Sequence, residues 1–145
     1  MKAIISLLIF FSYIPFAFAD SKDTTILIDA AALKKANPDK IILDGKIDSD
    51  IDHDNVMDVI NYAYNASTPP AACSEENCIV QNNRLITQPT LTFDIFLKGP
   101  KALIQINYVC TSIGVMKSIH NGMKDIFCGP SSILRWNDED YIKNN

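Results

Sequence analysis

The sequence predicts an α/β domain with a mainly parallel sheet and helices packed on it. Short β-branched or apolar runs alternate along the chain with segments of helical periodicity. The chain has 145 residues, a length that suits one domain with one core. Its four cysteines are an even number, which is typical of disulfide-stabilised exported domains.

The first nineteen residues have the pattern of a secretory signal peptide. Lys2 supplies the positive charge, residues 3–11 form an almost unbroken apolar run, and Ala17-Phe18-Ala19 is a small-x-small cleavage site. We therefore expect a leader over 1–19 and a single domain over 20–145 that is secreted or periplasmic. No later segment is long and apolar enough to cross a bilayer, so no membrane span is expected after cleavage.

The net charge of −4 and the absence of a basic stripe argue against nucleic-acid binding. No cofactor motif is present in the sequence, and no cofactor is expected. The partners left open are a protein or peptide and a second copy of the chain.

All four cysteines follow the leader and allow three disulfide connectivities. The simplest set pairs neighbours in sequence, Cys73–Cys78 and Cys110–Cys128. Zinc is the alternative, because Cys73 and Cys78 have ligand-like spacing. No second close cysteine or histidine pair completes such a site, so we expect no metal there.

The first elements after the leader are a strand, a helix and a strand. Residues 24–28 are short and β-branched, as in a strand. Asp29 is a candidate N-cap for a helix that stops at Asn37-Pro38. Residues 40–43 form an apolar run typical of a buried strand, bounded by Asp44-Gly45.

Residues 48–54 form the densest acidic cluster, with a carboxylate at every second position. Calcium is one interpretation. An EF-hand loop counted from Asp48 would need glycine where His53 stands and glutamate where Val59 stands. The alternative is an acidic entry to the next helix, where carboxylates are favoured. We expect calcium to bind weakly or not at all.

Residues 55–66 are predicted to be a helix, because Val56, Val59, Ile60 and Ala63 form one apolar stripe. Asn65-Ala-Ser67 is a glycosylation sequon that has meaning only in a eukaryotic secretory pathway.

The second half continues the alternation. Residues 78–80 begin a strand, 91–97 suit a strand or a helix, and 102–109 form a strand. Residues 112–121 are predicted to be a helix with Gly122 as its C-cap. Short strands follow at 126–128 and 133–134.

Three segments resemble the Clp protease proteolytic subunit and the wider Clp/crotonase-like superfamily. They are KIILDGKI at 40–47, CTSIGVMKSIHNG at 110–122 and IFCGPSS at 126–132. In this resemblance Ser112 matches the nucleophilic serine at a helix start, and Gly114 matches a glycine that follows it. The resemblance also implies that Cys110 and Cys128 lie on adjacent parallel strands, within reach of a disulfide.

The sequence departs from the family where its catalytic site should be. Asn82 and Asn83 stand at the oxyanion-loop position, where the family has two glycines, and no histidine follows residues 126–132. The expected function is therefore a catalytically degenerate binding or assembly module, with Ser112 as a helix N-cap. The alternatives are a serine hydrolase or peptidase that uses Ser112 with a non-standard base, and an exported inhibitor or immunity-type protein. Whether the chain is an enzyme stays open.

Overall fold

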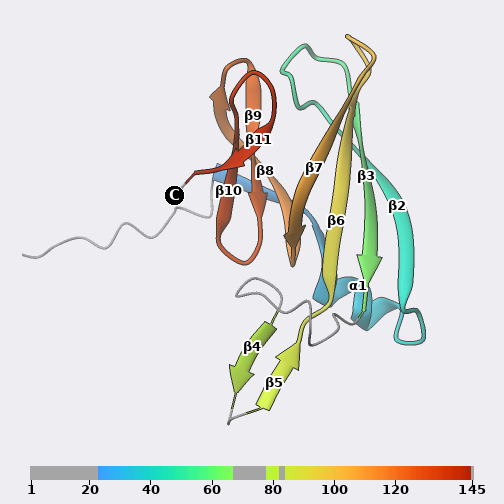
Figure 1. The fold of residues 1–145 in the computed structure, drawn as a ribbon. Helices are drawn as coiled ribbons and strands as arrows, with labels where there is room; N and C mark the ends of the chain where they lie inside the picture. Colours follow the sequence, from blue (N-terminus) through green and yellow to red (C-terminus); the bar gives the residue numbers. More distant parts are fainter. Residues whose placement is uncertain (1–22, 67–77, 82–83, 145) are drawn as a thin grey trace, which may run out of the picture.

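The computed structural model describes residues 23–66, 78–81 and 84–144. Two antiparallel sheets face each other as a sandwich (Figure 1). The four-stranded sheet has the order β2 (Ile42–Ser49), β3 (Asp58–Asn65), β6 (Thr90–Leu97), β7 (Ala102–Cys110). The five-stranded sheet has the order β1 (Thr24–Asp29), β8 (Ser112–His120), β9 (Met123–Cys128), β10 (Ser132–Trp136), β11 (Tyr141–Lys143).

Two further elements lie at one end of the sandwich. The helix α1 (Ala30–Ala36) connects β1 to β2, and a hairpin of β4 (Cys78–Gln81) and β5 (Arg84–Thr87) extends beyond it (Figure 1). No helix in the described parts of the chain has the length and apolarity needed to span a membrane.

The core lies between the sheets and is built from alternating strand residues. Ile60, Ile95 and Ile104 face it from three paired strands of the four-stranded sheet. Ile113, Ile126 and Leu134 are fully buried on the five-stranded sheet. Burial of each such side chain contributes about 2 kcal/mol before the entropy cost of folding is counted.

The predicted α/β class is wrong, because every strand pairing is antiparallel. The resemblance to the Clp/crotonase-like superfamily is wrong for the same reason. That family needs a strand, a helix that opens at Ser112, and a returning parallel strand. Here Ser112 is instead the first residue of strand β8, so it cannot be a helix N-cap.

The helix predicted over 55–66 is wrong, because most of this segment forms strand β3. The apolar residues that were assigned to one side of a helix lie on both faces of the strand. The buried positions alternate as Asp58, Ile60 and Tyr64, while Val56 is exposed. Valine, isoleucine and tyrosine are strand-favouring residues, and their pairing with both β2 and β6 stabilises the extended form.

The helix predicted over 112–121 is strand β8. Its first four residues are all buried, so the segment lacks the alternation that marks a half-exposed strand. Gly122 ends no helix: Asn121 and Gly122 have φ of 50° and 80° and form the turn between β8 and β9. Two successive residues at positive φ are typical of the tight turn of a hairpin.

The strand and helix predicted after the leader are confirmed. Asp29 caps α1, and its Oδ1 accepts a hydrogen bond of 2.8 Å from the backbone N–H of Ala32. The helix ends at Asn37, whose N–H reaches the carbonyl of Leu33. The strands at 102–109 and 126–128 are also present, and 91–97, which suited either structure, is strand.

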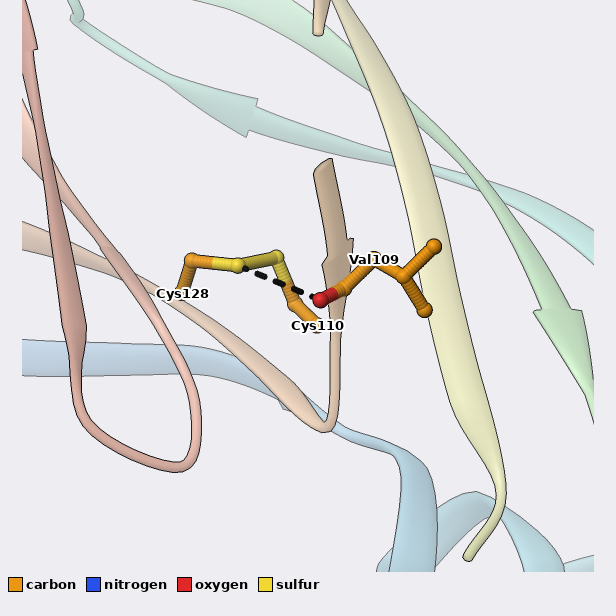
Figure 2. Close-up of a disulfide and its surroundings, with 3 residues drawn as sticks. All are labelled: Val109, Cys110 and Cys128. Carbon is orange, nitrogen blue, oxygen red and sulfur yellow. Dashed lines mark hydrogen bonds between the residues drawn. A yellow bond between two sulfur atoms is a disulfide. The ribbon is translucent and has the colours of Figure 1, made fainter. Parts of the chain in front are cut away.

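The predicted Cys110–Cys128 disulfide is present, although the parallel strands that the resemblance implied are not. It joins the last residue of β7 to the last residue of β9, and so it links the two sheets (Figure 2). The Cα atoms are 5.0 Å apart and both residues are buried. Cys128 Sγ lies 3.6 Å from the carbonyl oxygen of Val109; because a disulfide sulfur carries no hydrogen, this is a packing contact.

Candidate functional site

Ser112 lies at the start of β8, where the chain passes from one sheet to the other. Ser112 pairs with Asp29 of β1 and is 8% exposed. The Ser112 hydroxyl is packed against Gly129, where it occupies the space that a side chain at position 129 would need. The carbonyl of Ser112 accepts the N–H of Gly129 at 2.8 Å. These contacts make Ser112 part of the joint between the sheets.

The base that acyl transfer needs is far from Ser112. His120 lies eight residues along the same strand, a separation of about 26 Å at 3.3 Å per residue. The other histidine, His53, lies in the loop between β2 and β3. That loop lies beside Gly99 and Lys124 and not beside Gly129, which contacts Ser112: Asp54 is next to Gly99, and the Ile51 carbonyl accepts the N–H of Lys124. Neither can activate the Ser112 hydroxyl by a direct hydrogen bond.

Several of the other predicted site positions lie outside the described residues. Asn82 and Asn83 lie outside the described residues, as does Cys73, so the oxyanion-loop position and the Cys73–Cys78 pairing stay predictions. Cys78 opens strand β4.

A different serine, histidine and aspartate meet on the five-stranded sheet. Asp125 of β9 is 1% exposed and accepts a hydrogen bond of 2.6 Å from Ser118 Oγ. Its other oxygen lies 2.7 Å from His120 Nδ1. Arg135 Nε of β10 lies 3.4 Å from Asp125 and adds a positive charge. The carboxylate therefore holds three neighbouring strands together.

This cluster is not arranged as a catalytic triad. Ser118 and His120 both contact Asp125, whereas a triad needs the serine on the histidine. Burial, and then the nearby Asp125 charge, raise the pKa of Tyr141, so its hydroxyl stays protonated and donates to the Lys124 carbonyl at 2.8 Å. The sequence contained a signal for this cluster: a hairpin at Asn121-Gly122 places residues 118 and 125 opposite each other.

The acidic loop between β2 and β3 brings Asp50, Asp52 and Asp58 together, with one oxygen of each within 4.8 Å of the others. Most of these carboxylates have backbone partners. Asp58, fully buried, accepts the N–H groups of Ile51 at 2.8 Å and Lys98 at 3.0 Å. Asp50 accepts from Asp54 and Asn55.

Asp52 differs from its neighbours, since its buried Oδ1 has no hydrogen-bond partner among the described residues. Burial, followed by the charges of Asp58 and Asp54, raises the pKa of Asp52. These three side chains could hold a cation, but calcium takes six to eight oxygen ligands and most of these oxygens already organise the loop. Weak or absent calcium binding stays our prediction.

The remaining candidate is the free edge of the four-stranded sheet. Strand β2 pairs with β3 through eight consecutive residues, and no other strand of the described chain pairs with its second edge. Next to this edge lies a shallow hollow of about 480 Å³ over β2, β3 and β6. Its polar lining residues are Asp44, Lys46, Asn61, Thr92 and Asp94.

Asp44 and Lys46 are exposed on the face of β2 that points away from the core. Neither side chain makes a hydrogen bond or ion pair with another described residue. The small side chain of Ala63, opposite Asp44 on β3, leaves the hollow open between them. This edge therefore offers both backbone groups and unpaired charges to a partner.

Comparison with protein-family models, curated proteins and solved structures finds no match to this chain.

Proposed function

We propose that this chain is an exported, non-catalytic binding module that engages a protein partner along the free edge of β2. The observation that carries the proposal is the length and regularity of this open edge. All eight residues of β2 pair with β3 without a register shift. An extended segment of a partner can add a strand to such an edge through backbone hydrogen bonds.

The other edges of the two sheets are better protected against such pairing. β1 has a register shift between Ile26 and Ile28, which is typical of a bulged edge. β11 has only three residues. β7 ends in the disulfide, and the Tyr108 hydroxyl beside it accepts the N–H of Lys143 at 3.3 Å. β2 is the edge that lacks any such device apart from its charges.

The surroundings of Ser112 favour binding over hydrolysis. The hydroxyl is packed at a joint between the sheets, and the nearest histidine on its strand is about 26 Å away. A fluorophosphonate probe tests the hydrolase alternative. We expect no labelling of folded protein; stoichiometric labelling lost in Ser112→Ala would contradict the non-catalytic assignment.

Selection of phage-displayed peptides on the immobilised protein tests strand addition. We expect binders rich in β-branched residues that slow hydrogen exchange at the β2 amides directed away from β3. The amides of β9, which is paired on both sides, serve as the internal control. If the selected peptides protect another segment and leave β2 exchange unchanged, the proposal is wrong.

A further inference from the structure

The two faces of β2 carry different kinds of side chain. Leu43 and Ile47 point to the core side and are only half-buried, because β2 is the outermost strand of its sheet. Asp44 and Lys46 are exposed on the opposite face. Gly45 lies midway between the two members of each pair. An apolar residue therefore stands two positions away on either side of Gly45, and a charged residue one position away on either side.

We infer that β2 pairs antiparallel with β2 of a second copy of this chain, about a two-fold axis at Gly45. The inference rests on the proposed function, which makes β2 the binding edge, and it names the partner. The result is a homodimer with one continuous sheet of eight strands.

Charge complementarity supports this register. With the axis at Gly45, Asp44 lies opposite the partner's Lys46, and the symmetry repeats this pair. Opposite charges directly across two antiparallel strands are stabilising. Neither charge has a partner within the described chain, so no internal ion pair has to be broken.

Apolar pairing on the other face supports the same register. Leu43 lies opposite the partner's Ile47, again twice, so that the half-buried side chains cover each other. At the axis the two Gly45 residues meet, where a side chain would collide with the Tyr62 ring that already lies over Gly45. Gly45 therefore adds no side chain of its own to the centre of the interface, where the Tyr62 ring of each copy lies over its own Gly45.

The neighbouring registers are unfavourable. With the axis at Asp44, this residue would face its own copy. With the axis at Lys46, the two Lys46 ammonium groups would face each other and Asp44 would face the partner's Asp48. A shift by one residue would place core-side residues against outward ones. Like charges directly opposite each other destabilise a strand pair, so the register at Gly45 is selected.

Charge reversal gives a sharp test of the dimer. Asp44→Lys alone and Lys46→Asp alone each convert both attractive pairs into repulsive ones. We expect each variant to raise the dimer dissociation constant at least tenfold relative to the wild-type protein. Sedimentation equilibrium and light scattering of the full chain without its leader provide the measurement.

Two combinations should restore association. The double variant D44K/K46D recovers opposite charges within a homodimer. An equimolar mixture of the two single variants should form a heterodimer, because one chain then carries two lysines and the other two aspartates. Lys101→Asp, in the exposed turn before β7, matches the charge change of Lys46→Asp and should leave the dimer unchanged. Thermal melting of every variant checks that each is folded.

The outcomes separate the two proposals. A wild-type chain that stays monomeric up to about 1 mM overturns the self-pairing, while the peptide selection decides independently whether β2 is a binding edge. A dimer that persists in both single variants also overturns it, because the interface must then lie elsewhere. Single variants that are monomeric and fail to associate when mixed overturn the register at Gly45.

Discussion

The two ends of the sandwich join the sheets by different chemistry. At one end, the Cys110–Cys128 disulfide joins β7 to β9, and the N–H of Thr111 donates to the Gly129 carbonyl at 2.9 Å. At the other end, the acidic loop after β2 lies against β9, where Ile51 accepts the N–H of Lys124 at 2.9 Å. Asp58 fixes this loop through two backbone N–H groups.

The difference is between a covalent joint and a carboxylate joint. The disulfide reduces the conformational entropy of the unfolded chain, and its formation depends on the redox state of the compartment. The buried Asp58 acts only in the folded chain and depends on its hydrogen bonds. We therefore expect the two ends to respond to different perturbations.

The largest effect is expected from removal of the covalent joint. The double variant C110A/C128A should lose about 3 kcal/mol of unfolding free energy. Without the bridge, the unfolded chain has more conformational entropy than the bridged chain, and this favours unfolding. Urea denaturation without reductant provides the measurement. The same variant with reductant controls for the other two cysteines, and a loss below about 1 kcal/mol would show that the bridge restrains the unfolded chain little.

Breaking the carboxylate joint should have the next largest effect. Asp58→Ala leaves the N–H groups of Ile51 and Lys98 without their acceptor and should cost about 2 kcal/mol. Asp54→Ala is the matched control, since Asp54 is exposed and accepts the N–H of Val56 in the same loop. Equal losses in the two variants would contradict the special role of Asp58.

A smaller effect of opposite sign is expected at Asp52. Its raised pKa means that the ionised carboxylate disfavours the folded state, so its contribution to stability improves as pH falls through the folded-state pKa. Asp52→Asn should stabilise the protein near pH 7 by on the order of 0.5 kcal/mol. This gain should shrink toward pH 3.8, the ordinary value. Asp138→Asn makes the same chemical change at an exposed position in the turn between β10 and β11 and serves as the control variant.

The smallest effect is expected from calcium. Three carboxylates whose oxygens mostly accept backbone N–H groups leave too few ligands for a tight site. Addition of about 1 mM calcium should therefore leave the melting temperature unchanged. Titration calorimetry showing micromolar affinity, lost in Asp50→Ala and Asp52→Ala, would prove this wrong.

Several local features of the fold could be predicted from the sequence. Asp29 and Asn37 marked the limits of α1 because capping depends on neighbouring residues. The disulfide was the simplest pairing of four cysteines. The strands at 24–28 and 102–109 were recognisable from β-branched and alternating residues.

The fold class was missed because two strands have apolar residues at helical spacing. In β3 the competing alternation of Ile60, Tyr62 and Tyr64 was present, and the aromatic content favoured a strand. In β8 burial of consecutive residues removed the alternation. Asn121-Gly122 was the decisive signal, since this dipeptide between apolar runs marks a hairpin more strongly than a helix end.

The free edge of β2 could not have been located from sequence. Residues 40–43 indicated a strand, but whether it lies inside a sheet or at its border depends on contacts with β3 and β6. For the Asp125 cluster, the Asn121-Gly122 turn indicated the pairing of β8 with β9, but the place of Arg135 depends on the pairing of β9 with β10.

The pairing of β1 with β8 has a consequence for the order in which the chain assembles. Thr24 pairs with Met116, whereas most other strand pairs join neighbours in the chain. During synthesis β1 appears first, and it has no strand of its own sheet to pair with until β8 has followed. Long-range pairings of this kind form late because their loop-closure entropy is large. The step that completes the five-stranded sheet therefore closes a loop that contains the whole four-stranded sheet.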